Sequence, residues 1–296
     1  MAITKQKFGA VLLLDALGAG RLDVEGSTQF LKVSQTFRES LRSVMDSISK
    51  HGEFLDHETR PVEMHAFGDS VFFAWEAGAA PDGQYPITDA LAMASVASTV
   101  GLAWAVRKGT LFRGALTVGN YVTDGEVAIG PAAADAAYWY EEPKAALVIL
   151  TPQAATQWEA ALESDKVGTS KQVLADAFTE FVVPLKRVGD KRMWTIPWPR
   201  HFSVQVETDE KEEAAPRQVL LEIFEKMEAP PKAGVILLNT VKYFDEVMRR
   251  FPLDKIAMDA HDSGMRDAEA LMRMESGEHD DEHEASGLEQ LKPDRS

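Results

Sequence analysis

The residues Phe8–Leu14 form a short, nearly continuous apolar run, which Asp15 follows directly. A run of this length without polar alternation is typical of a strand that is buried on both faces at the centre of a sheet. A carboxylate at the end of such a strand costs free energy unless it is paired or bound to a metal. The run therefore predicts a fold built around a sheet, and it marks Asp15 as a candidate functional residue.

The segments after this run predict a helix and then a hairpin. Apolar residues recur every three or four positions between Phe30 and Ile48, which predicts an amphipathic helix with Ser27 as its N-cap. Two strand-like runs then meet at Gly68-Asp69, where a glycine in the first central position suits a two-residue turn. Asp69 is therefore expected at the tip of a hairpin.

The alternation of helices and strands continues through the first two thirds of the chain. Helices are expected over 88–107, from Pro131 and after Pro152, and strands over 112–119, 125–130, 146–150, 178–185 and 191–197. The order β-α-β-β-α-β predicts an α+β fold of the ferredoxin-like kind, an antiparallel sheet with helices on one face.

Beyond Pro199 the pattern becomes helical and then strongly polar. Three further helices are expected, over 216–227, 232–250 and 254–274. This organisation predicts a main domain over 1–199, a helical extension over 200–275 and an acidic disordered tail over 276–296.

Composition excludes several classes of function. The formal net charge of −16 argues against a nucleic-acid-binding surface, because a polyanion would be repelled. The chain has no cysteine, which excludes disulfides and thiolate metal sites and favours the reducing cytoplasm. No stretch reaches the roughly 18 apolar residues that a membrane helix needs, so no membrane association is expected.

The two aspartates and a glycine-bearing loop form the candidate site. Asp15 precedes Gly18, Ala19 and Gly20, whose backbone amides can hold phosphate oxygens. Asp69 is expected near Asp15 at one edge of the sheet, and carboxylates with phosphate oxygens are the ligands that Mg²⁺ and Mn²⁺ prefer. Taken singly, either aspartate is also explained as an ordinary cap or turn residue.

Four segments, LLLDALGAG, HAFGDSVFFAW, FRGALTVGNYV and VAIGPAAADAAYWYEE, resemble the class III nucleotidyl cyclases in order and spacing. The resemblance covers Lys7–Pro197 and is strongest to the pyrimidine cyclases of bacterial anti-phage Pycsar systems. It implies a class III cyclase catalytic domain over 1–199. It also implies a cytoplasmic enzyme that converts UTP to 3′,5′-cyclic UMP and pyrophosphate, a second messenger in anti-phage defence.

The resemblance further implies the parts of the active site. Asp15 and Asp69 would hold two divalent cations, Mn²⁺ or Mg²⁺, with the Ala16 carbonyl as a further ligand. The loop Gly18–Gly20 would hold the phosphates. A head-to-tail homodimer with two shared sites is implied, and a separate effector with a cyclic-nucleotide-binding domain would read the product.

Several positions depart from the purine-specific members of that family. His65 stands where a lysine reads the purine base, and Val127 stands where its aspartate or threonine partner would be. Ala134 and Tyr138 replace the asparagine and arginine that assist the transition state in many members, although a shift of one residue would bring in Asp135. The missing purine readers favour a pyrimidine, and sub-family frequency favours UTP over CTP.

Arg113 lies just inside a predicted strand, where its planar guanidinium can pair with a triphosphate or form a surface salt bridge. His65 is either a base contact or a strand histidine with satisfied hydrogen bonds. Tyr138 to Tyr140 are expected to serve helix packing and dimer contact. Three other functions stay open: a cytidylate cyclase, a purine cyclase (adenylate or guanylate) with unusual base contacts, and a catalytically silent cyclase-homology module that binds nucleotide.

Overall fold

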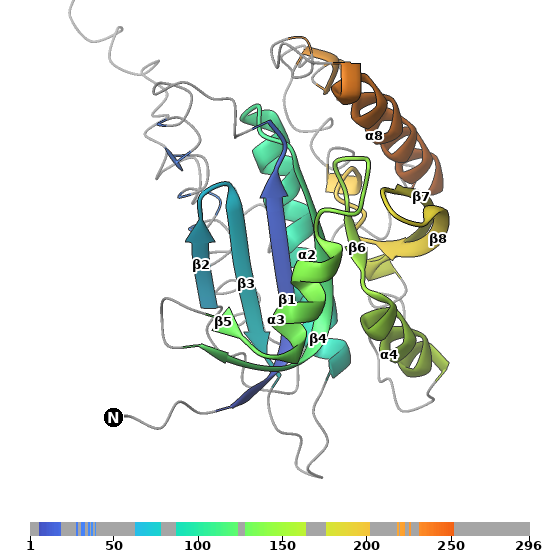
Figure 1. The fold of residues 1–296 in the computed structure, drawn as a ribbon. Coiled ribbons are helices and arrows are strands. Elements are labelled where there is room, and N and C mark those ends of the chain that lie inside the picture. Colours follow the sequence, from blue (N-terminus) through green and yellow to red (C-terminus); the bar gives the residue numbers. More distant parts are fainter. Residues whose placement is uncertain are drawn as a thin grey trace, which may run out of the picture.

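The computed structural model describes residues 6–18, 63–77, 87–123, 128–163, 176–201 and 231–251, with isolated positions within 28–39 and 218–225. These residues form an eight-stranded sheet in the order β2-β3-β1-β4-β6-β8-β7, with β5 paired to β4 (Figure 1). The strands are β1 Lys7–Ala16, β2 Glu63–Phe67, β3 Ser70–Glu76, β4 Phe112–Thr123, β5 Ala128–Ile129, β6 Val148–Leu150, β7 Thr179–Leu185 and β8 Gly189–Thr195. The helices are α2 Ile87–Arg107, α3 Pro131–Trp139, α4 Pro152–Glu163 and α8 Pro231–Arg250.

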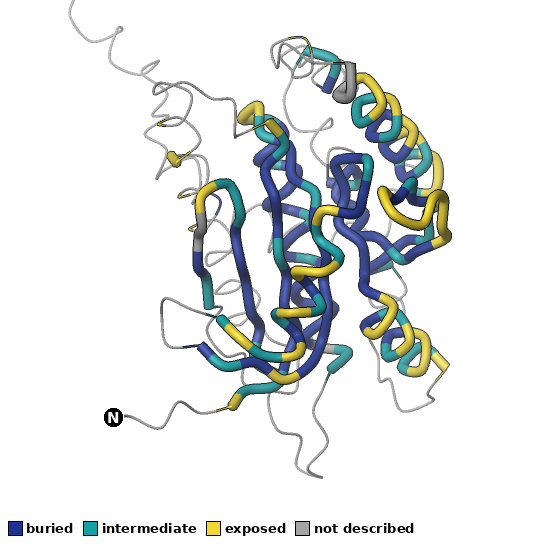
Figure 2. The backbone as a smooth tube through the Cα atoms, viewed as in Figure 1, coloured by how far each residue is buried: buried dark blue, intermediate teal, exposed yellow. Residues whose placement is uncertain are grey.

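Strand β1 lies inside the sheet, between β3 and β4, and runs antiparallel to both. Its apolar residues are buried on both faces, and Figure 2 shows its backbone mostly in the colour of buried residues. The hairpin β2–β3 turns at Gly68, whose φ of 59° is a left-handed conformation that glycine adopts without strain. The predicted central strand and hairpin are confirmed.

The two faces of the sheet contribute to two separate hydrophobic cores. Leu12 and Leu14 of β1 pack into the larger core with α2, whereas Val11 packs with Ala132 and Ala136 of α3. Figure 1 accordingly shows α2 behind the sheet and α3 in front of it. The α+β class is confirmed, but the expectation of helices on one face is wrong: they lie on both faces, because a strand that is apolar on both sides needs cover on both.

The sheet is mixed and not antiparallel throughout as expected, since β4 and β6 run parallel while the other paired strands run antiparallel. The parallel pair follows from the connection, in which the chain turns back through β5 and crosses the sheet as α3 before it enters β6. A crossover through a helix returns the chain in the same direction as the first strand.

Helix α2 is the main helix of the larger core. Its segment 90–107 is long and apolar enough by composition to cross a membrane, with a mean hydropathy of 1.4, contrary to the expectation that no stretch would be. In this structure 78% of that segment is buried inside the molecule. Packing against the sheet accounts for its apolar composition.

Helix α8 confirms the helix expected over 232–250, and it packs against the sheet beside β7. Tyr243, Phe244 and Val247 belong to the larger core. The Tyr243 hydroxyl donates a hydrogen bond of 2.5 Å to the carbonyl oxygen of Ile196. The described positions within 28–39 and 218–225 are helical, as predicted there. The helix expected over 254–274 and the tail lie outside the described residues.

Candidate active site

Asp15 and Asp69 lie together at the carboxyl end of β1. Asp15 is the penultimate residue of β1, and Asp69 lies in the turn between β2 and β3. The backbone N–H of Ala16 donates a hydrogen bond of 3.0 Å to the carbonyl oxygen of Asp69, which joins the hairpin tip to the end of β1. The structure thus brings together the two aspartates that the sequence singled out.

Arg113 pairs with Asp15 across the β1–β4 ladder. Its Nε and Nη2 atoms donate hydrogen bonds of 2.9 and 2.7 Å to Oδ2 of Asp15. The two side chains are 13% and 11% exposed, so this ion pair is largely removed from water. Of the two roles considered for Arg113, the salt bridge is the one present here, although it is buried and involves the candidate catalytic residue.

The electrostatic environment of Asp15 favours a bound cation or proton. Burial raises the pKa of Asp15 above its usual value, and this effect exceeds the lowering by the Arg113 hydrogen bonds. The nearby carboxylates of Asp69 and Glu141 raise the pKa further. A divalent cation that bridged the Asp15 and Asp69 carboxylates would relieve this repulsion.

The donor set suits a hard divalent cation, provided that a substrate supplies further oxygens. Carboxylate and backbone carbonyl oxygens are the ligands that Mg²⁺ and Mn²⁺ prefer. Within the described part of the chain, no group of three or more His, Cys, Asp and Glu side chains is placed to hold a metal ion. A cation held by Asp15, Asp69 and the Ala16 carbonyl would therefore need phosphate oxygens to complete its coordination sphere.

The carboxyl end of α3 approaches the same end of the sheet. Gly130, the N-cap of α3, lies beside Asn120 and Tyr121 of β4, and the hydroxyl of Thr117 donates a hydrogen bond of 2.6 Å to Asp135 one turn later. The helix thus runs back along β4 toward Arg113. Because a helix carries partial negative charge at its carboxyl end, α3 adds to the negative potential there.

Tyr140 and Glu141 follow this helix end and were missed as site residues. The Tyr140 hydroxyl donates a hydrogen bond of 2.9 Å to Oε1 of Glu141, and Lys186 lies 3.3 Å from Oε2. Burial and the Glu141 hydrogen bond raise the pKa of Tyr140 to about 12, and the charges of Asp15 and Asp69 contribute. The available signal was the run Tyr140-Glu141-Glu142 directly after α3, which places two carboxylates at a helix end.

His65 lies on β2, on the same face of the sheet as Asp15. It pairs with Phe72, which pairs in turn with Leu13, and Asp15 is two residues beyond Leu13 on β1. Two strand spacings and two residue rises separate His65 from Asp15 by about 12 Å. The His65 side chain is 8% exposed, and its Nε2 has no hydrogen-bond partner among the described residues.

The remaining predicted residues are distributed as follows. Gly18 is exposed and has a φ of 85°, whereas Ala19, Gly20 and Val127 lie outside the described residues. Ala134 is also exposed.

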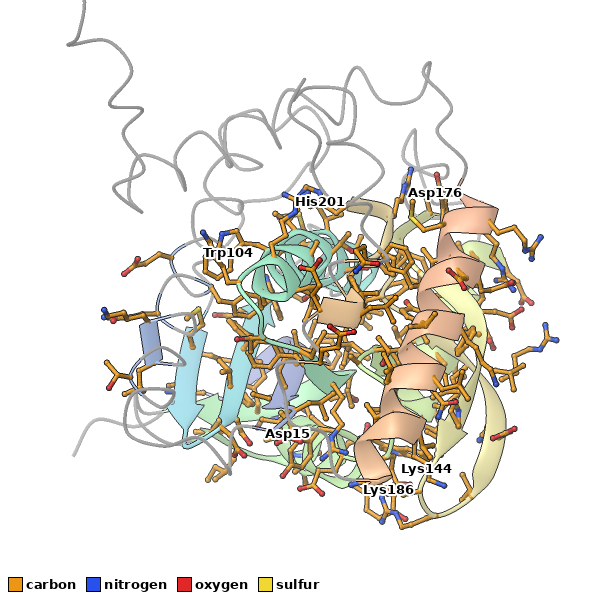
Figure 3. All side chains as sticks on the ribbon, turned by 90° about the horizontal axis from the view of Figure 1, so that it is seen from above. Asp15, Trp104, Lys144, Asp176, Lys186 and His201 are labelled. Carbon is orange, nitrogen blue, oxygen red and sulfur yellow. The ribbon has the colours of Figure 1, made fainter. Side chains whose placement is uncertain are left out.

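Two further positions, compared above with family residues that assist the transition state, make contacts within this chain. The ring of Tyr138 is 58% exposed and lies 3.9 Å beneath the Arg187 guanidinium. Asp135 bonds to the sheet through Thr117. Figure 3 shows Asp15, Lys144 and Lys186 on one side of the molecule, with His201 and Trp104 on the other.

Comparisons with known proteins give structural similarities only. No protein-family model matches the chain, and no curated protein matches it. The fold is similar to the catalytic core of a rhodopsin-guanylyl cyclase with converted specificity, solved in complex with ATPαS (TM-score 0.39, 13% identity, 65% of this chain and 97% of that chain). It is also similar to a bacterial light-regulated adenylyl cyclase (TM-score 0.38, 12% identity, 77% of this chain and 60% of that chain).

Proposed function

We propose that the chain is a nucleotidyl cyclase, which converts a nucleoside triphosphate into a cyclic mononucleotide and pyrophosphate. The observation that carries the proposal is the convergence of Asp15 and Asp69 at one end of the sheet, joined by the Ala16–Asp69 hydrogen bond. Two carboxylates in a partly buried, negatively charged environment suit divalent cations, and these cations would in turn bind a triphosphate.

The residues of the chain would hold and orient the substrate. Asp15 and Asp69 would bind two divalent cations, Mn²⁺ or Mg²⁺, and the Gly18 end of the loop would approach the phosphates. When bound, such cations neutralise the triphosphate and activate the attacking hydroxyl. Arg113 fixes the orientation of Asp15 by its two hydrogen bonds to Oδ2, which leaves Oδ1 for another ligand.

The reaction is an in-line displacement at phosphorus. The ribose 3′ oxygen forms a bond to the α-phosphorus, and the bond between that phosphorus and the oxygen bridging to the β-phosphate breaks. Pyrophosphate leaves with the electron pair, and the hydroxyl proton passes to solvent. Most of the barrier reduction would come from positioning and from stabilisation of charge.

The base would extend along the sheet toward His65. His65 and Asp15 lie on the same face of the sheet, with backbones about 12 Å apart. An imidazole offers one donor and one acceptor, unlike the lysine of purine cyclases. The missing purine readers favour a pyrimidine and sub-family frequency favours UTP over CTP, so we propose UTP as the substrate and 3′,5′-cyclic UMP as the product.

We further propose a cytoplasmic homodimer whose two sites are shared between the subunits. Its product would serve as a second messenger in anti-phage defence, read by a separate effector with a cyclic-nucleotide-binding domain. The motif resemblance supports these proposals. They are tested by the mass of the protein in solution and by the response of such an effector to the product.

The experiment that tests the activity is incubation of the full chain with Mn²⁺ and each of ATP, GTP, CTP and UTP separately, followed by mass spectrometry of the products. Cyclic UMP is expected. Asp69→Ala should abolish turnover and preserve the melting temperature, because Asp69 lies in a turn outside the core. Asp190→Ala, which alters an exposed aspartate on β8, is the matched control. Full activity of Asp69→Ala would refute the mechanism.

A second candidate is a catalytically silent module that binds nucleotide. The Asp15–Arg113 ion pair favours it, because the guanidinium occupies one carboxylate oxygen that a cation would use. Such a module would bind a nucleoside triphosphate in calorimetry and release no pyrophosphate. Release of pyrophosphate with any of the four nucleotides excludes it.

A further inference from the structure

The connector between α3 and β6, residues 140–147, borders the candidate site at both of its ends. At its start lie Tyr140 and Glu141, where α3 has run back along β4 toward Arg113, and the charge of Glu141 raises the pKa of Asp15. At its end, the carbonyl oxygen of Leu147 accepts a hydrogen bond of 3.1 Å from the N–H of Gly114, the residue after Arg113. The end of the connector is therefore joined to β4 beside Arg113, and the charge at its start acts on Asp15.

Glu142 attaches the connector to the turn between β7 and β8. The Glu142 side chain is 6% exposed, and its Oε1 accepts a hydrogen bond of 2.6 Å from Nε of Arg187. Its Oε2 accepts a second bond, of 3.0 Å, from the Arg187 backbone N–H. The Glu142 carbonyl oxygen accepts a third, of 2.9 Å, from the N–H of Lys186. A buried carboxylate with partners for both oxygens is held in one position.

Arg187 joins the same turn to the last turn of α3. Its Nη2 donates a hydrogen bond of 2.5 Å to the carbonyl oxygen of Tyr138, and its guanidinium lies 3.9 Å from the centre of the Tyr138 ring. One arginine thus holds the helix end through Tyr138 and the connector through Glu142. Tyr140 and Glu141 lie between Tyr138 and Glu142 in the sequence, so the contacts of Arg187 with these two residues restrict their positions.

Helix α8 holds the other half of the connector. Nδ2 of Asn239 donates a hydrogen bond of 2.9 Å to the carbonyl oxygen of Lys144, and the N–H of Ala146 donates one of 2.8 Å to Thr240. The connector is therefore fixed from the β7–β8 turn on one side and from α8 on the other. Loss of one attachment leaves the other in place.

We propose that the Glu142–Arg187 pair positions Tyr140 and Glu141 beside Asp15 and Asp69, and so sets the geometry in which cations and nucleotide bind at this site. Glu142 and Arg187 are positioning residues, which act through the connector and need no contact with the substrate. The inference rests on the proposed function, since it assigns these residues a role in that same site.

The test compares the full-length wild-type protein with Arg187→Ala and Glu142→Gln. Arg192→Ala is the matched control, because it removes an exposed ion pair with Glu180 on the same hairpin. Four quantities are measured: the kcat and the KM for UTP with Mn²⁺, the affinity for Mn²⁺ alone by calorimetry, and the melting temperature.

Arg187→Ala should lower kcat on the order of 10- to 100-fold, because small misplacements at a reacting centre have effects of this size. It should also weaken Mn²⁺ binding severalfold at a temperature where the protein stays folded. Glu142→Gln keeps the shape and one acceptor oxygen, so its losses should be smaller and in the same direction. Arg192→Ala should match the wild type in all four quantities.

Wild-type kcat and Mn²⁺ affinity in folded Arg187→Ala would overturn the inference and leave the proposed function intact. If the wild-type protein makes no cyclic nucleotide from any triphosphate, the proposed function fails instead. Mn²⁺ affinity then decides the positioning role by itself, since weakened binding in Arg187→Ala supports it and unchanged binding overturns it.

Discussion

The guanidinium of Arg113 donates two hydrogen bonds to a single oxygen of Asp15, from Nε at 2.9 Å and from Nη2 at 2.7 Å. Both side chains are nearly buried, so each is the main charge partner of the other. A buried ion pair of this kind contributes little to stability as a pair, but the loss of one partner leaves an uncompensated charge.

The first prediction follows from this pair. Arg113→Ala should lower the free energy of unfolding by about 3 kcal/mol at neutral pH, because the Asp15 carboxylate then lacks its buried partner. The loss, measured by urea denaturation, should be smaller in the presence of Mn²⁺, since a cation can replace the guanidinium. Arg113→Lys keeps the charge but loses the planar guanidinium, so its free energy of unfolding should lie between those of Arg113→Ala and the wild type. Equal stability of Arg113→Ala and the wild type would contradict the prediction.

The second prediction concerns alkaline stability. Burial and the Glu141 hydrogen bond raise the pKa of Tyr140 to about 12, and burial raises that of Tyr243 as well. The folded state thus holds the phenolic protons more tightly than the unfolded chain, in which tyrosine titrates near pH 10. The associated stability is fully present below about pH 10 and is lost as the pH rises toward 12.

Urea denaturation at a series of alkaline pH values measures this effect. In Tyr243→Phe the decrease of stability above about pH 10 should be smaller than in the wild type, because one of the two shifted phenols is absent. At neutral pH the same variant should be less stable by about 1 kcal/mol, since the hydrogen bond to Ile196 is lost. An unchanged alkaline slope in Tyr243→Phe would show that this phenol does not contribute.

The third prediction distinguishes a docked α8 from a separate extension. Phe244 lies in the larger core and packs against Trp198, with ring centroids 6.1 Å apart. Phe244→Ala should therefore lower the free energy of unfolding by about 3–5 kcal/mol. Leu238→Ala, on the same helix but 54% exposed, should change it by no more than about 0.5 kcal/mol. If Phe244→Ala leaves the free energy of the main unfolding transition unchanged, α8 unfolds independently.

The elements of the fold were predictable where the signal is local. The continuous apolar run of β1, the Gly68-Asp69 turn and the proline that opens α3 each specify a structure within a few residues. The face of the sheet that each helix covers could not be predicted from such local sequence patterns. Whether α3 packs with α2 or on the opposite face depends on how the chain crosses the sheet after β5, which no local pattern encodes.

The candidate site divides in the same manner. Asp15 and Asp69 were predictable because a buried strand end and a hairpin tip are local features. The connection of Glu142 to Arg187 spans 45 residues and depends on where the β7–β8 turn meets the end of α3. The partner of Arg113 was equally hidden, because the register of β1 against β4 decides that it faces Asp15.

The last prediction concerns His65, whose buried Nε2 has no partner among the described residues. A buried polar atom without a hydrogen bond costs about 1–3 kcal/mol, a cost that a nucleotide base can remove when it binds. His65→Leu should therefore preserve or raise the melting temperature while it raises the KM for UTP by roughly 10- to 100-fold. This opposition between stability and affinity is the signature of a residue kept for ligand binding. If His65→Leu lowers the melting temperature and leaves the KM unchanged, His65 is a packing residue of the sheet and the base lies elsewhere.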